Sequence, residues 1–128
     1  NLAMHCATLP MFGYHIIEDD GMDMANSQRL QFDFTFKSRE ACLQQLDESS
    51  AKCRAAIAKA SNDHLTALWK FSFGEQLISN NPRSMSFRSM CFDHLVHHTA
   101  QLGVYLRLND IPVPGLYGPS ADEQWMPN

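Results

Sequence analysis

The sequence predicts an all-α fold, a helical bundle followed by a long irregular C-terminal tail. Residues 1–19, 38–62 and 82–108 each carry apolar side chains at spacings of three and four, which is typical of amphipathic helices. Strand-like alternation is confined to LQFDFTF, residues 30–36, and one isolated strand is only marginally stable. Residues 112–128 are rich in proline and glycine without periodicity, which indicates the tail.

The first helix is expected over residues 1–19, and a long connection follows it over residues 20–37. Long loops inside compact domains are often functional. Its alternating phenylalanines, Phe32, Phe34 and Phe36, are expected to form an extended segment that packs on the helices.

The middle helix is expected to begin after Ser38, a favourable N-cap residue, and to end near residue 62. Its core-facing stripe has spacings of four, seven and four and consists of Cys42, Leu46, Cys53 and Ile57. Residues 61–81 are less regular, and we expect a short helical turn there, followed by an extended piece across the bundle.

The last helix is expected over residues 82–108. Two asparagines precede Pro82, a pattern that predicts a polar N-cap with proline at the first helical position. Asn109, Asp110 and Pro112 end the periodic pattern.

Three helices would leave one face of a four-helix bundle open. The chain begins with Asn1 rather than methionine, and its first residues already have a helical pattern. We therefore expect a leading helix to be missing from this chain. The apolar faces that such a helix would cover are then expected to be buried against a second copy, which predicts a homodimer.

Composition limits the class of protein. With 128 residues, 45% hydrophobic and 19% charged, residues 1–128 are expected to form one globular domain. A net charge of −4 without a basic stripe argues against nucleic acid as a partner. The apolar runs are too short for a transmembrane helix, and no signal peptide is recognisable. The four cysteines form no C-x-x-C pair, which predicts reduced thiols and a cytoplasmic location.

Three histidines fall within five positions of the last helix: His94, His97 and His98. At about 100° per residue, His94 and His98 lie one turn apart on the same face, and His97 lies to one side. An i, i+4 histidine pair can chelate one ion, as in helical zinc motifs. The pair alone is equally compatible with two histidines that hydrogen-bond to neighbours or lie at a wet surface.

A metal site with open coordination positions would need a third protein ligand. The candidates are His5, His15 and His64. His5 and His15 lie about 15 Å apart along one helix and cannot serve the same ion. Periodicity does not choose between these two, and His64, in the irregular stretch, is most simply an exposed residue.

Three stretches resemble the DinB-like (DinB/YfiT-like) metalloenzyme family. They are HLVHHTAQLGVYLRLNDIPVPGLYGPSADE at residues 94–123, LAMHCATLPMFG at residues 2–13 and WKFSFGEQLISNNPR at residues 69–83. The resemblance implies a four-helix bundle whose first helix is absent here. The family often has Arg-Gly after its paired histidines, where this chain has Thr99 and Ala100.

The resemblance also implies a divalent metal ion, nickel or zinc, held by His5, His94 and His98. His15 then becomes a residue of the helix surface. Three further side chains are candidates to support these ligands or a bound water, namely His97, Gln101 and Tyr105.

The function that the resemblance implies is that of a metal-dependent enzyme of the thiol-S-transferase or hydrolase type. Its substrate would be a small molecule, with a low-molecular-weight thiol as a candidate partner. The absence of an H-E-x-x-H motif argues against peptide hydrolysis. Because no acid, base or nucleophile is identifiable beyond the metal, two alternatives stay open. They are a non-catalytic metal- or ligand-binding bundle with a stress-response role, and a helical interaction module.

Overall fold

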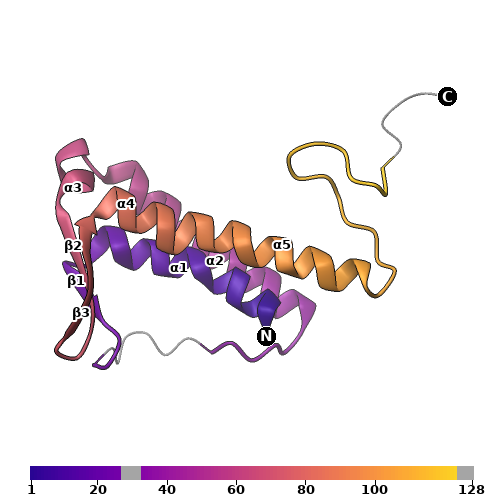
Figure 1. Cartoon of the computed structure of the whole chain (residues 1–128), viewed down its shortest axis with the longest axis horizontal. Coiled ribbons are helices and arrows are strands. Elements are labelled where there is room, and N and C mark those ends of the chain that lie inside the picture. Colours follow the sequence, from indigo (N-terminus) through magenta and orange to yellow (C-terminus); the bar gives the residue numbers. More distant parts are fainter. Residues whose placement is uncertain (27–32, 124–128) are drawn as a thin grey trace.

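The computed structural model describes residues 1–26 and 33–123. Its elements in chain order are α1 (Leu2–Glu18), β1 (Gly21–Asp23), α2 (Arg39–Lys59), α3 (Asn62–Thr66), β2 (Leu68–Phe73), β3 (Gln76–Pro82), α4 (Arg83–Phe87), the π-helical turn η2 (Arg88–Phe92) and α5 (Asp93–Arg107). Figure 1 shows α4, η2 and α5 as one continuous rod beside α1 and α2, with the strands across one end.

The prediction of an all-α four-helix bundle is wrong, because the described residues combine helices with a three-stranded mixed sheet. The short helical turn expected in residues 61–81 is α3, and the extended piece expected after it is the hairpin of β2 and β3. β1 pairs in parallel with β2, and β2 pairs antiparallel with β3, in the order β1-β2-β3. Each strand therefore has a partner strand for its backbone hydrogen bonds, unlike the isolated strand-like stretch considered for residues 30–36.

Two glycines allow this sheet to form. Gly74 has a φ of +57° in the turn between β2 and β3, a conformation that side chains with a Cβ rarely adopt. A Cβ at Gly21 would lie 2.8 Å from the carbonyl oxygen of Lys70, so the close pairing of β1 with β2 requires glycine there. The register of β2 against β3 shifts between Phe71 and Ser72, as in a bulge.

The core joins the sheet to the helices. Ile16 of α1, Met22 of β1 and Trp69 of β2 are buried together. The partly buried side chains packed against them are Phe12, Phe71, Phe87 and Met90. This core holds the end of α1 and the beginning of the rod in a fixed relation, and the histidines of both elements lie further along.

α2 begins as the sequence predicts, since the side chain of Ser38 accepts a hydrogen bond from the backbone N–H of Ala41 at 3.1 Å. Its buried face is shifted from the expected stripe. Ser49, Cys53 and Ala56 are buried, whereas Ile57 is 38% exposed. The hydroxyl of Ser49 donates to the carbonyl oxygen of Ala7 at 2.6 Å, which ties α2 to α1. The polar Ser49 thus lies on the face that an apolar stripe was expected to define.

The rod begins one residue later than expected, because Pro82 is the residue before the first helical turn and not its first residue. The long connection after α1 was expected to place its phenylalanines on the helices. Phe32 lies outside the described residues, and residues 33–38 have no regular secondary structure. Phe36 is 50% exposed. Phe34 does pack on a helix residue, because its ring lies edge to face against the ring of His5 with the two centroids 5.2 Å apart.

The segment after α5 has no helix or strand over residues 108–123, and Figure 1 shows it looping beside the C-terminal part of the rod. Arg107 pairs with Asp122 at 2.9 Å and so ties this tail to the end of α5. Among the described residues, no helix has both the length and the apolar character needed to cross a membrane.

Candidate metal centre

Three histidines from two helices meet between α1 and α5. His5 lies in the first turns of α1, His94 lies at the beginning of α5, and His98 follows one turn later. One ligand nitrogen from each ring lies within 4.8 Å of the other two. The ring centroid of His5 lies 5.1 Å from the ring centroid of His94 and 4.5 Å from that of His98. The ring centroids of His94 and His98 lie 4.6 Å apart. This group, the histidine trio, could hold a metal ion.

The separation of the donor atoms suits one cation. The Nε2 atoms of His5 and His94 lie 3.4 Å apart. Two imidazole nitrogens that bind one tetrahedral zinc ion at about 2.0–2.1 Å are separated by roughly 3.4 Å. The side chains of His5, His94 and His98 are all half-buried, so the trio is neither sealed in the core nor dispersed on the surface.

Hydrogen bonds set the tautomers of the two α5 histidines. Nδ1 of His94 lies 3.2 Å from the carbonyl oxygen of Met90, and Nδ1 of His98 lies 2.7 Å from Oε1 of Gln101. Both oxygens only accept, so each Nδ1 carries the proton and donates it. Each Nε2 therefore keeps a lone pair for a cation, which is the usual arrangement of metal-binding histidines.

The surroundings of His5 and His94 favour the neutral form of these two rings. Burial lowers the pKa of His5 below its ordinary value, and the nearby His98 and His94 lower it further. Burial also lowers the pKa of His94, helped by His98 and His97 and opposed by the hydrogen bond to Met90. Metal ions bind neutral imidazole, so these shifts favour the ligand form at neutral pH.

The π-helical turn η2 determines which face of the rod carries His94 and His98. A π turn contains one residue more than the corresponding α-helical turn, and one extra residue rotates the following helix by about 100°. η2 ends at Phe92, directly before the helix that carries both histidines. Met90, which accepts the hydrogen bond from His94, belongs to this turn. π-Helical turns occur frequently at functional sites.

The other candidate ligands have partners elsewhere. Nδ1 of His15 lies 2.8 Å from a carboxylate oxygen of Asp19, and Nε2 of His64 donates to the carbonyl oxygen of Ile17 at 2.6 Å. The structure thus brings His5, and neither of these two, to the paired histidines. The thiol of Cys6 next to His5 has a pKa raised mainly by burial, which disfavours a thiolate ligand there.

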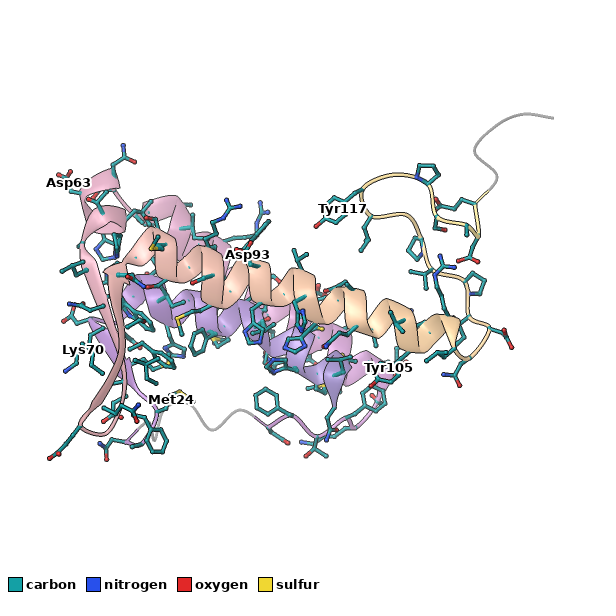
Figure 2. The ribbon with its side chains drawn as sticks, in the orientation of Figure 1. Met24, Asp63, Lys70, Asp93, Tyr105 and Tyr117 are labelled. Atoms are coloured by element: carbon teal, nitrogen blue, oxygen red, sulfur yellow. The ribbon has the colours of Figure 1, made fainter. Side chains whose placement is uncertain are left out.

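The three candidate supporting residues differ in position. Gln101 contacts His98 directly. His97 is exposed, with its ring 4.9 Å from that of His98, and it is not part of the trio. Tyr105 is 61% exposed, and Figure 2 shows it on α5 toward the C-terminal end of the helix.

An apolar cavity of about 510 Å³ adjoins the trio, with His5 and His94 in its lining. Sequence reasoning missed this cavity. Its walls come from α1, Met24 just after β1, β2, η2, α5 and the segment that carries Phe34, and only the folded arrangement brings them together. The one sequence signal was the row of phenylalanines in the long connection, of which Phe34 touches His5.

Comparisons with known proteins do not identify a relative: no family model, curated protein or solved structure matches the chain. The likeness to DinB-like proteins therefore rests on the sequence motifs alone.

Proposed function

We propose that this protein is a metal-dependent enzyme related to the DinB-like proteins, a transferase or hydrolase that acts on a small molecule. The observation that carries the proposal is the histidine trio, whose three donors come from two helices and can hold one metal ion. Nickel and zinc are the expected ions, because imidazole is a suitable ligand for both.

The number of donors favours a catalytic site over a structural one. Structural zinc sites are usually closed by four protein ligands, whereas catalytic sites have three and keep a position open. Within the described part of the chain, the group that could hold an ion consists of three histidines. A bound divalent cation would act as a Lewis acid and lower the pKa of a water or thiol that binds to it.

The chain's own residues would bind the metal ion, orient the histidine ligands and shield one side of the site from water. Gln101 and the carbonyl of Met90 hold the Nδ1 protons of His98 and His94, so that Nε2 of each ring can serve as a ligand. Apolar side chains of the adjoining cavity, such as Phe34 and Phe71, would exclude water from one side of the trio. A small molecule, including a low-molecular-weight thiol, would then supply the reacting group itself.

A second candidate is a non-catalytic metal- or ligand-binding protein. Among the described residues, the cavity beside the trio is lined by no carboxylate, lysine or cysteine that could act as acid, base or nucleophile. This absence favours binding without turnover, or a reaction in which the substrates bring the reactive groups.

The proposal is tested by metal titration of the apoprotein by calorimetry with nickel and zinc. Wild type is expected to bind one ion per chain. His98→Ala, which removes a donor, is expected to bind at least about 100-fold more weakly, since a lost ligand costs more than the 10–100-fold of a lost supporting residue. The matched control is His97→Ala, which makes the same change at the adjacent exposed residue and should bind much as wild type does.

Turnover separates the two candidate functions. Metal-loaded protein is assayed with electrophilic small molecules and a panel of low-molecular-weight thiols, with His98→Ala as the blank. Turnover above that blank supports the enzyme. Metal binding without turnover supports the non-catalytic binder, and His98→Ala binding metal as tightly as wild type would contradict both.

A further inference from the structure

The cavity beside the histidine trio has the size and lining of a small-molecule site. Its volume of about 510 Å³ lies within the range of roughly 300–1,000 Å³ that is typical of ligand pockets. Six apolar side chains form most of its wall: Leu9, Phe12, Met24, Phe34, Phe71 and Met90. An aromatic-rich wall of this kind contributes binding energy through the apolar area that it buries.

The two hydroxyl groups of the wall already donate their protons within the fold, so they offer a ligand an acceptor oxygen and no donor. The hydroxyl of Thr8 donates to the backbone carbonyls of Met4 and His5 at 3.0 Å each. The hydroxyl of Ser89 donates to the carbonyl oxygen of Met85 at 3.0 Å. Among the described residues, no charged side chain lines the cavity. A charged group inside it would lose its hydration without gaining a partner, which is costly.

We propose that the cavity binds an uncharged, mainly apolar molecule that carries one polar, metal-ligating group at the end near His5 and His94. This proposal names the substrate class of the metal centre, and its second half rests on the proposed function. The six apolar wall residues hold the apolar body of the ligand. Its polar end lies beside the imidazole rings of His5 and His94, which also line the cavity. Strongly charged thiols and phosphorylated compounds are then poor ligands.

The apolar half is tested without metal, with the neutral fluorescent probe N-phenyl-1-naphthylamine. Ser89→Phe adds a large side chain at an exposed position of the cavity wall. The probe should bind wild type in a saturable 1:1 manner and Ser89→Phe at least about tenfold more weakly, because the added ring occupies cavity volume that the probe needs. Ser84→Phe makes the same change at an exposed residue outside the wall and should bind as wild type does.

A second variant guards against a folding defect in the first. Met24→Trp enlarges a wall residue that is 40% exposed and should also weaken probe binding. His98→Ala removes a metal donor that is not part of the wall, so the probe should still bind to it. Unchanged probe affinity in both filled variants, or no saturable binding to wild type, would overturn the apolar site and leave the metal titration unaffected.

The polar end is tested with cobalt-loaded protein, whose absorption spectrum reports thiol coordination. Phenylmethanethiol, with an apolar body, should bind at least about tenfold more tightly than 2-mercaptoethanol, since only the first buries a ring. Ser89→Phe should remove this preference and still bind cobalt. Equal affinities of wild type for the two thiols would refute the link between cavity and metal. If wild type bound the probe but not cobalt, the metal centre would be refuted and the apolar site would stand.

Discussion

At the scale of single residues, the contact between His98 and Gln101 bears directly on the candidate metal centre. Oε1 of Gln101 accepts the Nδ1 proton of His98 at 2.7 Å. Without this acceptor, the His98 ring can rotate and can place its proton on either nitrogen. The metal site would then have to fix the ring and the tautomer on binding, which costs affinity.

Gln101→Ala is therefore expected to weaken nickel or zinc binding by about 10–100-fold, the usual effect of removing such a partner. Isothermal titration calorimetry at fixed pH measures it. Gln101→Glu retains an acceptor oxygen and should preserve affinity or raise it. If alanine at this position left the affinity unchanged, the hydrogen bond would have no role in ligand positioning.

Gly13 is a second residue whose identity is dictated by its neighbours. A Cβ at this position of α1 would lie 2.6 Å from Sγ of Cys91 and 3.0 Å from Sγ of Cys53. Both cysteines are buried, so neither sulfur has free space into which to move. The glycine thus permits α1, α2 and the rod to approach one another.

Gly13→Ala should lower the free energy of unfolding by about 1–3 kcal/mol through overpacking. Gly103→Ala is the matched control on α5, where a new Cβ would meet the side chain of Val113 at an ordinary 3.6 Å. That change should raise stability by up to about 1 kcal/mol, because alanine favours helix over glycine. Urea unfolding of both variants checks the opposite signs.

At the scale of elements, Arg83 connects the end of α1 to the beginning of the rod. Its guanidinium is buried and donates to the carbonyl oxygen of Ile16 at 2.7 Å and also to that of Asp19. These carbonyls belong to the last turn of α1 and its C-cap, where helix carbonyls lack partners within the helix. Arg83 therefore provides hydrogen-bond donors to carbonyl groups at the end of α1, a role that the sequence pattern does not indicate.

Arg83→Met keeps the apolar stem and removes these hydrogen bonds. It should destabilise the protein by about 2 kcal/mol or more, since buried carbonyls would be left without donors. Arg88→Met alters an arginine whose side chain is 78% exposed and should change stability by less than about 0.5 kcal/mol. Chemical unfolding curves of the two variants decide the point, and similar midpoints would contradict this role of Arg83.

The elements also differ in how far the sequence predicted them. The helices α1, α2 and the rod were expected at nearly their observed positions, because their apolar spacing is long and regular. β2 and β3 were expected only as one extended piece, because their pairing into a sheet depends on contacts with other strands and not on the local pattern alone. β1 has only three residues and exists through its pairing with β2.

At the scale of the whole molecule, the histidine trio makes the stability of the metal-free protein depend on pH. Burial is the main cause that lowers the pKa of His5 and His94 in the folded state, below the ordinary value of 6.5 that applies when the chain is unfolded. The unfolded chain then binds more protons than the folded protein as pH falls below about 6.5. Stability from these groups is complete above that pH and is lost progressively toward the lower folded pKa.

Metal-free protein in chelator should therefore have a lower melting temperature at pH 5.5 than at pH 7.5, at equal ionic strength. The double variant His5→Ala/His94→Ala should show a smaller difference, because it lacks the two groups. The acidic residues with lowered pKa values, including Asp33 with a pKa of about 2, are affected only at lower pH. An equal difference in both proteins would contradict this origin.

The sequence by itself determined the long helices and the pairing of His94 with His98, because both depend on local helical spacing. It also supplied His5 as a candidate third ligand, and the motif resemblance to DinB-like proteins selected it. The homodimer and the cytoplasmic location stay predictions.

Only the tertiary structure decided the sheet, the apolar cavity and the convergence of the trio. These features join residues that are distant in sequence, such as His5 and His94. The convergence of the trio also follows the π-helical turn and the close packing at Gly13. A local pattern cannot encode them, since the rotation of the rod and the approach of α1 are fixed by contacts between elements.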